Sequence, residues 1–179
     1  MIRTEAIKFF VVCLLTISIY SCSAPVKDTI DEPAKTEKII RHDRANSPIL
    51  KGVSVPAGYS YFFTSGQVGN VLDTTAAYGD PARYGDTYTQ AKGALGKIET
   101  VLGEAGLTMK DVVFMRVFVA PDKNNEDKLD FDGFFKAYGE YFNNEENPDK
   151  VARTTLGVAS LVREGMFIEI EAVAAYPSN

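Results

Sequence analysis

The pattern of hydrophobic and polar positions along the chain predicts four strands. Residues 58–66 are aromatic and β-prone and end in a Ser-Gly turn, and residues 111–120 are apolar on both alternating faces apart from Arg116. Residues 152–161 and 165–176 form two further strand-like segments, joined by a short polar turn. A strand that is apolar on both faces belongs inside a sheet, so we expect residues 111–120 to be central.

The last of these segments carries two acidic residues. In a strand, Met166, Ile168, Ile170 and Ala172 would share one face, and Glu169 and Glu171 would lie on the other. Residues two apart on a strand are separated by about 7 Å, so the two carboxylates would be neighbours. The pattern predicts that this face is exposed to water or that one carboxylate has a function.

Two segments have helical spacing. Asp86 is a suitable N-cap for a helix that begins near Thr87 and is ended by Gly106. Its apolar positions are Ala91, Leu95, Ile98 and Leu102. The second helix has an aromatic stripe that is typical of a core face: Phe131, Phe134, Phe135, Tyr138, Tyr141 and Phe142. The interleaved order of strands and helices predicts an α+β fold, with both helices packed on one face of a mixed sheet.

The first 44 residues differ from the rest of the chain. Residues 1–21 combine Arg3 and Lys8 with a short apolar run, as in a signal peptide. Cys22 follows a small residue, as in the lipobox of bacterial lipoproteins, so we expect an exported, periplasmic protein that is lipid-anchored through Cys22. An ordinary signal peptide with an incidental cysteine is the alternative. Residues 22–44 are polar and predict a flexible tether, and residues 45–179 form one domain.

Charge and missing residue types narrow the chemistry of this domain. From Ala45 onward the sequence has 12 Lys and Arg against 18 Asp and Glu, a net charge of −6, which disfavours nucleic acid as a partner. The same part contains no His, Cys or Trp. Zinc sites built on His or Cys, and Ser-His-Asp or Cys-His nucleophile systems, are therefore excluded there. We expect no metal site.

Several segments together resemble the RidA/YjgF family of imine deaminases, also called L-PSP endoribonuclease-like. They are FFTSGQVG, GKIETVLGEAGLTMKDVVFMRVFVA, DFDGFFKAYGEYF, ARTTLGVASL and IEIEAVAAY, and the resemblance spans about residues 47–176. It implies a chorismate-mutase-like subunit, a homotrimer with ligand clefts between neighbours, and hydrolysis of 2-imino acids or enamines to 2-oxo acids and ammonia. It also implies that no metal or organic cofactor is used.

The resemblance assigns roles to individual residues. Arg153 matches the arginine that binds the substrate carboxylate, a role that suits its planar guanidinium, and a surface ion pair is the alternative. Glu169 matches the catalytic glutamate that positions a water beside the imine carbon, and simple pairing with a basic residue is the alternative. The backbone at Ser65 and Gly66 would approach the substrate, unless this segment is only a turn that ends a strand. Glu171 is expected to form an ion pair or hydrogen bond.

The sequence departs from the family pattern at three positions around this site. Ile49 stands where many members have tyrosine, Phe135 where they have asparagine, and Thr155 where they have cysteine. We expect Ile49 and Phe135 to line the cleft and Thr155 to contact the substrate. A second function therefore stays open, a non-catalytic binder of small carboxylates such as 2-oxo acids. A ribonuclease or a purely protein-binding role is disfavoured.

A loop rich in Gly, Asp and Pro is predicted at residues 70–86. Together with the start of the following helix it offers Tyr78, Tyr84 and Tyr88 as candidates for a rim or lid over the cleft. Exposed loop decoration is the equally plausible interpretation.

Overall fold

The computed structural model describes residues 38–176. The predicted signal peptide, Cys22 and most of the predicted tether lie outside these residues. Within residues 38–176, no helix is both long enough and apolar enough to cross a membrane.

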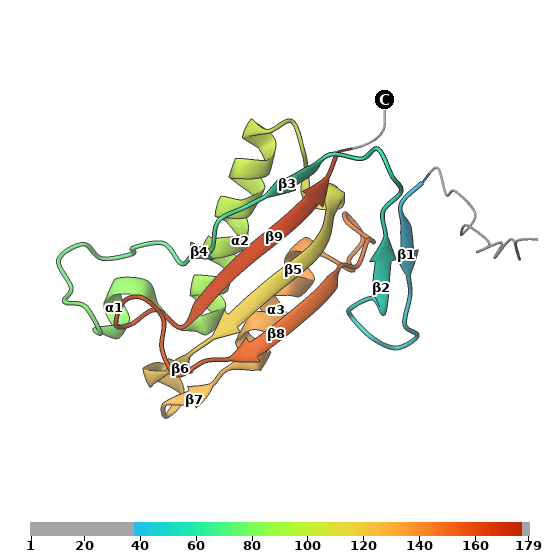
Figure 1. Cartoon of the computed structure of the whole chain (residues 1–179). Helices are drawn as coiled ribbons and strands as arrows, with labels where there is room; N and C mark the ends of the chain where they lie inside the picture. The colour runs from blue at the N-terminus through green and yellow to red at the C-terminus, as the bar shows by residue number, and fades with distance from the viewer. Residues whose placement is uncertain (1–37, 177–179) are drawn as a thin grey trace, which may run out of the picture. The chain divides into compact units, whose positions relative to one another are not determined.

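A mixed sheet forms the centre of the fold (Figure 1). Its strands follow the order β3 (Tyr61–Phe63), β9 (Ile168–Ala175), β5 (Val112–Val119) and β8 (Ala152–Gly157), with β4 (Gln67–Val68) also paired to β9. β5 runs antiparallel to β9 and parallel to β8, which confirms its predicted central place. The strands β8 and β9 follow each other in the chain, but β5 lies between them in the sheet.

Two helices cover one face of this sheet (Figure 1). α2 (Thr87–Glu104) begins as predicted, because the Asp86 side chain accepts a hydrogen bond from the backbone N of Thr89 at 2.8 Å. α3 (Phe131–Tyr141) is capped in the same way by Asp130. The shorter elements are α1 (Pro81–Tyr84), η1 (Met109–Asp111), β6 (Pro121–Asp122), η2 (Lys123–Asn125) and β7 (Lys128–Leu129).

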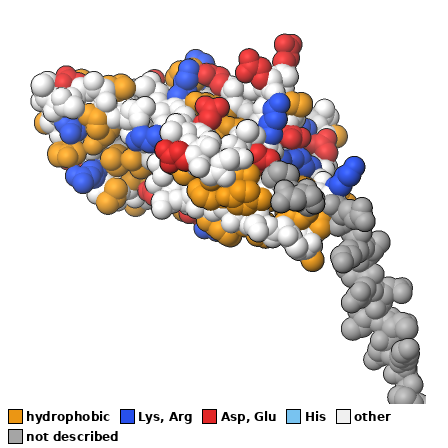
Figure 2. Space-filling model, turned by 90° about the horizontal axis from the view of Figure 1, so that it is seen from above, with side chains coloured by type: hydrophobic (Ala, Val, Ile, Leu, Met, Phe, Trp, Pro, Cys, Tyr) orange, Lys and Arg blue, Asp and Glu red, His pale blue; other side chains and the backbone are white. Residues whose placement is uncertain are grey.

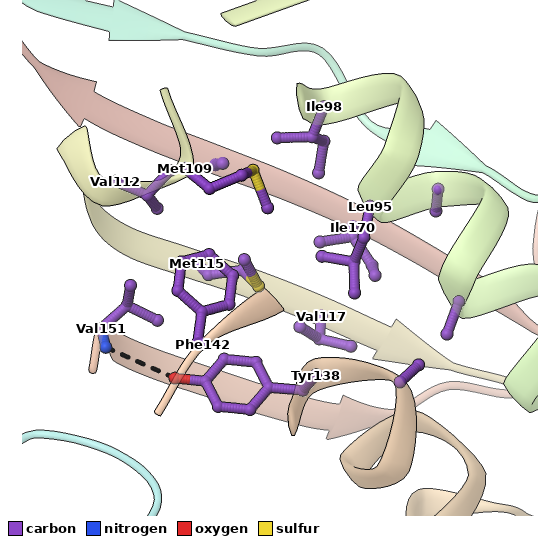
Figure 3. Packing of buried hydrophobic residues seen from close by; sticks show 14 of the residues in the cluster. Leu95, Ile98, Met109, Val112, Met115, Val117, Tyr138, Phe142, Val151 and Ile170 are labelled. Carbon is purple, nitrogen blue, oxygen red and sulfur yellow. Dashed lines mark hydrogen bonds between the residues drawn. The ribbon is translucent and has the colours of Figure 1, made fainter. Parts of the chain in front are cut away.

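The hydrophobic core lies between the helices and the sheet, as Figure 3 shows. The four predicted apolar positions of α2 are all fully buried. Most of the aromatic stripe on α3 is also core, and Phe134, Tyr138 and Phe142 are almost completely buried. Phe135 is the exception, with 43% of its surface exposed. The predicted α+β fold with both helices on one face is thus confirmed.

The two faces of the sheet have different character because consecutive side chains of a strand alternate between them. On β9, Ile168, Ile170 and Ala172 are buried beneath the helices. Glu169, Glu171 and Val173 point to the opposite face, which we call the open face because none of the described helices covers it. The predicted position of both glutamates on one face is confirmed.

The end of the predicted tether is part of the folded structure. β1 (Ile40–His42) pairs antiparallel with β2 (Gly52–Ser54), so the prediction of a tether up to Arg44 is wrong for this stretch. Arg41 fixes the hairpin by donating to the carbonyl oxygens of Val112 at 3.0 Å, Lys150 at 2.8 Å and Lys110 at 2.7 Å. These acceptors are backbone atoms, so no side-chain pattern in the sequence around Arg41 indicates that this hairpin is attached to the domain.

Replacing Arg41 by alanine should release the β1–β2 hairpin. Because hydrogen bonds from a charged donor contribute about 1.5–3 kcal/mol each, and this side chain is partly exposed, we expect the free energy of unfolding to fall by roughly 2 kcal/mol. Urea unfolding measures this change. Lys38→Ala is the matched control, since Lys38 is exposed, and an equal effect of both variants would contradict the anchoring role of Arg41.

Candidate functional site

Arg153 lies on the helix-covered face at the edge of the sheet. It is in register with Met115 of β5, a core residue, and its side chain points toward α3. The guanidinium carbon lies over three aromatic rings of that helix, 4.4 Å from the ring centre of Tyr138, 4.8 Å from Phe134 and 5.1 Å from Phe135. The rings hold the cation through cation–π attraction and set its orientation.

The guanidinium of Arg153 has unused hydrogen-bonding capacity. Its Nε and Nη1 atoms are buried and have no hydrogen-bond partner within the described part of the chain. Burial lowers the pKa of Arg153 from its usual range, although an arginine stays protonated. A buried cation without a partner is costly, and a carboxylate is the natural ligand for it. The alternative of a surface ion pair finds no support, because Arg153 forms none with any described residue.

Other residues predicted for the site gather near Arg153. Thr155 is in register with Val117 and so shares its face, and Phe135 contributes one of the three rings. Ile49 lies in a segment fixed to the start of β8, since Leu50 N donates to Val151 O at 3.2 Å and the Tyr138 hydroxyl donates to Pro48 O at 3.2 Å. We call Ile49, Phe135, Arg153 and Thr155 the arginine half-site.

Glu169 lies on the open face, in register with Phe118 of β5 and Val68 of β4. Its carboxylate has no hydrogen-bond or ion-pair partner among the described residues, so the alternative of simple pairing with a base is not observed. The carboxylate lies directly against the backbone of Gly66, where a Cβ atom would overlap Glu169 Oε1. The absence of a side chain at Gly66 therefore permits this close approach, beyond the role of the glycine in ending a strand. We call Ser65, Gly66 and Glu169 the glutamate half-site.

Glu171 has the structural role that the sequence predicted. It forms a salt bridge with Arg116, its direct neighbour across the β5–β9 pair. Both side chains lie on the open face, where opposite charges on adjacent strands stabilise the pairing. Of the two glutamates on this strand, only Glu169 is left with a free carboxylate.

The two half-sites lie on opposite faces of the same sheet. Arg153 shares the helix-covered face with Met115 and Ala172, whereas Glu169 shares the open face with Phe118. Side chains that leave a sheet in opposite directions cannot contact one small molecule. A single chain therefore brings together the members of each half-site but keeps Arg153 apart from Glu169.

The open face also exposes large apolar side chains. Phe63 is 68% exposed and Leu156 is 47% exposed, and Phe114, Phe118 and Val173 are only partly buried. Apolar surface of this kind on a sheet is typical of an interface between protein molecules.

The predicted loop at residues 70–86 packs against the turn before β9. Arg163 donates to the Tyr78 hydroxyl at 3.2 Å, and Arg83 stacks over the Tyr78 ring at 4.4 Å. Figure 2 shows hydrophobic side chains among Lys and Arg side chains at this end of the molecule. Tyr84 is buried in α1, so its assignment to a rim or lid is wrong. Tyr78 is 52% exposed and stays a candidate for the rim or lid. The Tyr88 hydroxyl donates a hydrogen bond to Glu140 on α3.

Sequence reasoning missed the part that Phe134 and Tyr138 play beside Arg153. Their spacing marked them correctly as core residues, and Figure 3 shows Tyr138 packed within the core. Their contact with the guanidinium depends on the position of α3 over β8, which no local pattern reveals. Among the described residues, no cluster of His, Cys, Asp or Glu side chains could hold a metal ion.

Comparisons with known proteins identify relatives of this chain. A family model described as Endoribonuclease L-PSP matches residues 55–176. A RutC family protein from Synechocystis is 32% identical over 143 residues, covering 80% of this chain and 99% of the relative. A RutC family protein from Haemophilus influenzae is 29% identical over 133 residues, covering 70% and 95%.

Solved structures of similar proteins share this fold. Escherichia coli TdcF with bound serine is 28% identical, with 79% of this chain and 95% of that chain covered and a TM-score of 0.51. A Rid family protein from Yersinia pestis is 21% identical, with coverage of 77% and 98% and a TM-score of 0.55, which supports the fold alone. The chain belongs to the L-PSP endoribonuclease family, which includes the RutC and YjgF proteins.

Proposed function

We propose that this protein is a hydrolytic deaminase of small 2-imino or enamine carboxylic acids that works without a cofactor. Its site would form between two copies, with the arginine half-site from one copy and the glutamate half-site from its neighbour. The observation that carries the proposal is a guanidinium whose buried Nε and Nη1 atoms have no hydrogen-bond partner among the described residues, combined with the carboxylate of Glu169 on the opposite face of the same sheet.

The residues suit each step of this reaction. Arg153 would bind the substrate carboxylate and fix the position of the imine carbon. Glu169 would hold a water and accept its proton as the oxygen attacks that carbon. The resulting tetrahedral adduct would collapse as the proton passes to nitrogen, so that the C–N bond breaks and ammonia leaves. One water is consumed, and the products are a 2-oxo acid and ammonia.

Assembly into a homotrimer would complete the site and cover the apolar open face. The exposed Phe63 and Leu156 support such an assembly, because a symmetric contact would remove them from water. The serine bound to TdcF supports a small carboxylate as ligand. Export and lipid anchoring through Cys22 stay part of the proposal. They would place the protein where it meets substrates from outside the cytoplasm.

A non-catalytic binder of small carboxylates is the second candidate. The exposed Phe135 beside Arg153 favours it, because the arginine half-site alone provides a cation and an apolar wall. The two functions differ in what they require of Glu169, which a binder does not need for affinity.

The proposal predicts different defects for the two half-sites. Imines are generated from alanine or 2-aminobutanoate with an amino-acid oxidase and the residual imine is trapped with semicarbazide. We expect the wild type to accelerate imine loss. Glu169→Gln should lower turnover by roughly 10²–10⁴-fold and still bind 2-oxo acids, whereas Arg153→Ala should lose both turnover and 2-oxo acid binding. Glu104→Gln, at an exposed position on α2, controls for the change in charge.

The two functions give opposite results in this assay. A wild type that fails to accelerate imine loss, yet binds 2-oxo acids through Arg153, would contradict the deaminase and favour the binder. Loss of binding in Glu169→Gln would contradict the separate roles of the half-sites.

Gly66→Ala should displace the Glu169 carboxylate. The backbone of Gly66 is not left-handed, so alanine is tolerated there, and the flexible glutamate would move away from the new methyl group. We expect turnover to fall by at least about tenfold while the free energy of unfolding changes by less than about 1 kcal/mol. Gly52→Ala is the control, since nothing lies within 4 Å of a Cβ there, and unchanged turnover in Gly66→Ala would contradict the role of this contact.

A further inference from the structure

The aromatic surface beside Arg153 is larger than the proposed reaction requires. Phe134 and Tyr138 are buried and hold the guanidinium, but Phe135 is 43% exposed beside them. Phe131, one helical turn earlier, stacks on Phe135 with ring centres 6.4 Å apart and an angle of 23° between the planes. The exposed ring is thus held in place by its neighbour and faces solvent next to a cation.

A row of residues on β8 continues from this ring pair. Arg153, Thr155 and Gly157 follow one another on the same face of the strand, over a length of about 13 Å. Leu129 lies over Gly157, where a Cβ atom would meet its side chain, and Leu129 is 38% exposed. The row begins at a positive charge and ends at a leucine, with the rings of α3 alongside.

The charges at the far end of this row disfavour a second anionic group. Asp130 and Asp132 flank Phe131 in the chain at the start of α3. Lys128, which precedes Leu129, is already paired with Glu126 at 2.5 Å. A dicarboxylate bound at Arg153 would therefore direct its second carboxylate toward acidic residues, whereas an apolar side chain would be removed from water there.

We propose that Phe135 is a specificity-determining residue and that the site prefers 2-imino and 2-oxo acids with a branched or aromatic side chain. This inference rests on the proposed function, because it extends the same site. The ligand carboxylate binds Arg153, and its side chain passes Thr155 and covers the surface formed by Phe131, Phe135 and Leu129. Pyruvate-sized acids leave that surface in water and dicarboxylates are repelled.

Binding of stable 2-oxo acids to the purified protein tests this preference without requiring turnover. The probes are pyruvate, 2-oxoglutarate, 4-methyl-2-oxopentanoate and phenylpyruvate, with dissociation constants from calorimetry. We expect the last two to bind at least about tenfold more tightly than pyruvate, because their larger side chains would bury the apolar surface of several more carbon atoms. Phe135→Asn should remove this preference, so that 4-methyl-2-oxopentanoate and phenylpyruvate bind no more tightly than pyruvate. Arg153→Ala should abolish binding of all four acids.

The controls separate this inference from its alternatives. Val162→Ala removes an exposed apolar side chain from a different segment and should leave the preference intact. Equal affinities for the four acids, a preference that survives Phe135→Asn, or dissociation of the oligomer by Phe135→Asn would each overturn the inference. Loss of imine hydrolysis with the binding preference intact would count against the proposed reaction and not against this preference.

Discussion

Alternation of side chains along a β-strand is the constraint on which the account of this protein depends. Successive residues of a strand point to opposite faces, so the register of β8, β5 and β9 decides where each functional group lies. It directs Arg153 toward the helices and Glu169 toward the open face. No rotation of side chains within one copy changes this separation, because the sheet itself stands between the two groups.

The same constraint connects the stability of the fold with its function. One face of the sheet must be apolar to bury the hydrophobic sides of α2 and α3, and the buried residues of β9 and β5 meet that demand. At the edge of this core, the aromatic residues that pack α3 also hold the guanidinium of Arg153. The opposite face is free of helices and combines exposed apolar side chains with the free carboxylate of Glu169, which suits a surface that other copies cover.

The elements with strong local signals could be predicted from the sequence. The Asp86 cap and the spacing from Ala91 to Leu102 located α2, and the apolar run around Met115 identified the central strand. Local patterns carry no information about which strands pair, so the position of β5 between β8 and β9 was not predicted. The attachment of β1 was missed because Arg41 bonds to backbone carbonyls. The resemblance suggested the roles proposed for Arg153 and Glu169, but their placement on opposite faces required the three-dimensional register.

The most direct test of the two-half-site account is to mix two inactive variants. Arg153→Ala and Glu169→Gln each damage one half-site, so each homo-oligomer should be inactive in the imine assay. After the two proteins are unfolded together and refolded as mixed oligomers, a site that takes its arginine from one copy and its glutamate from another should be intact in about a quarter of cases. The account predicts that roughly this fraction of wild-type activity returns. Mixed oligomers, verified by mass, that remain inactive would contradict it.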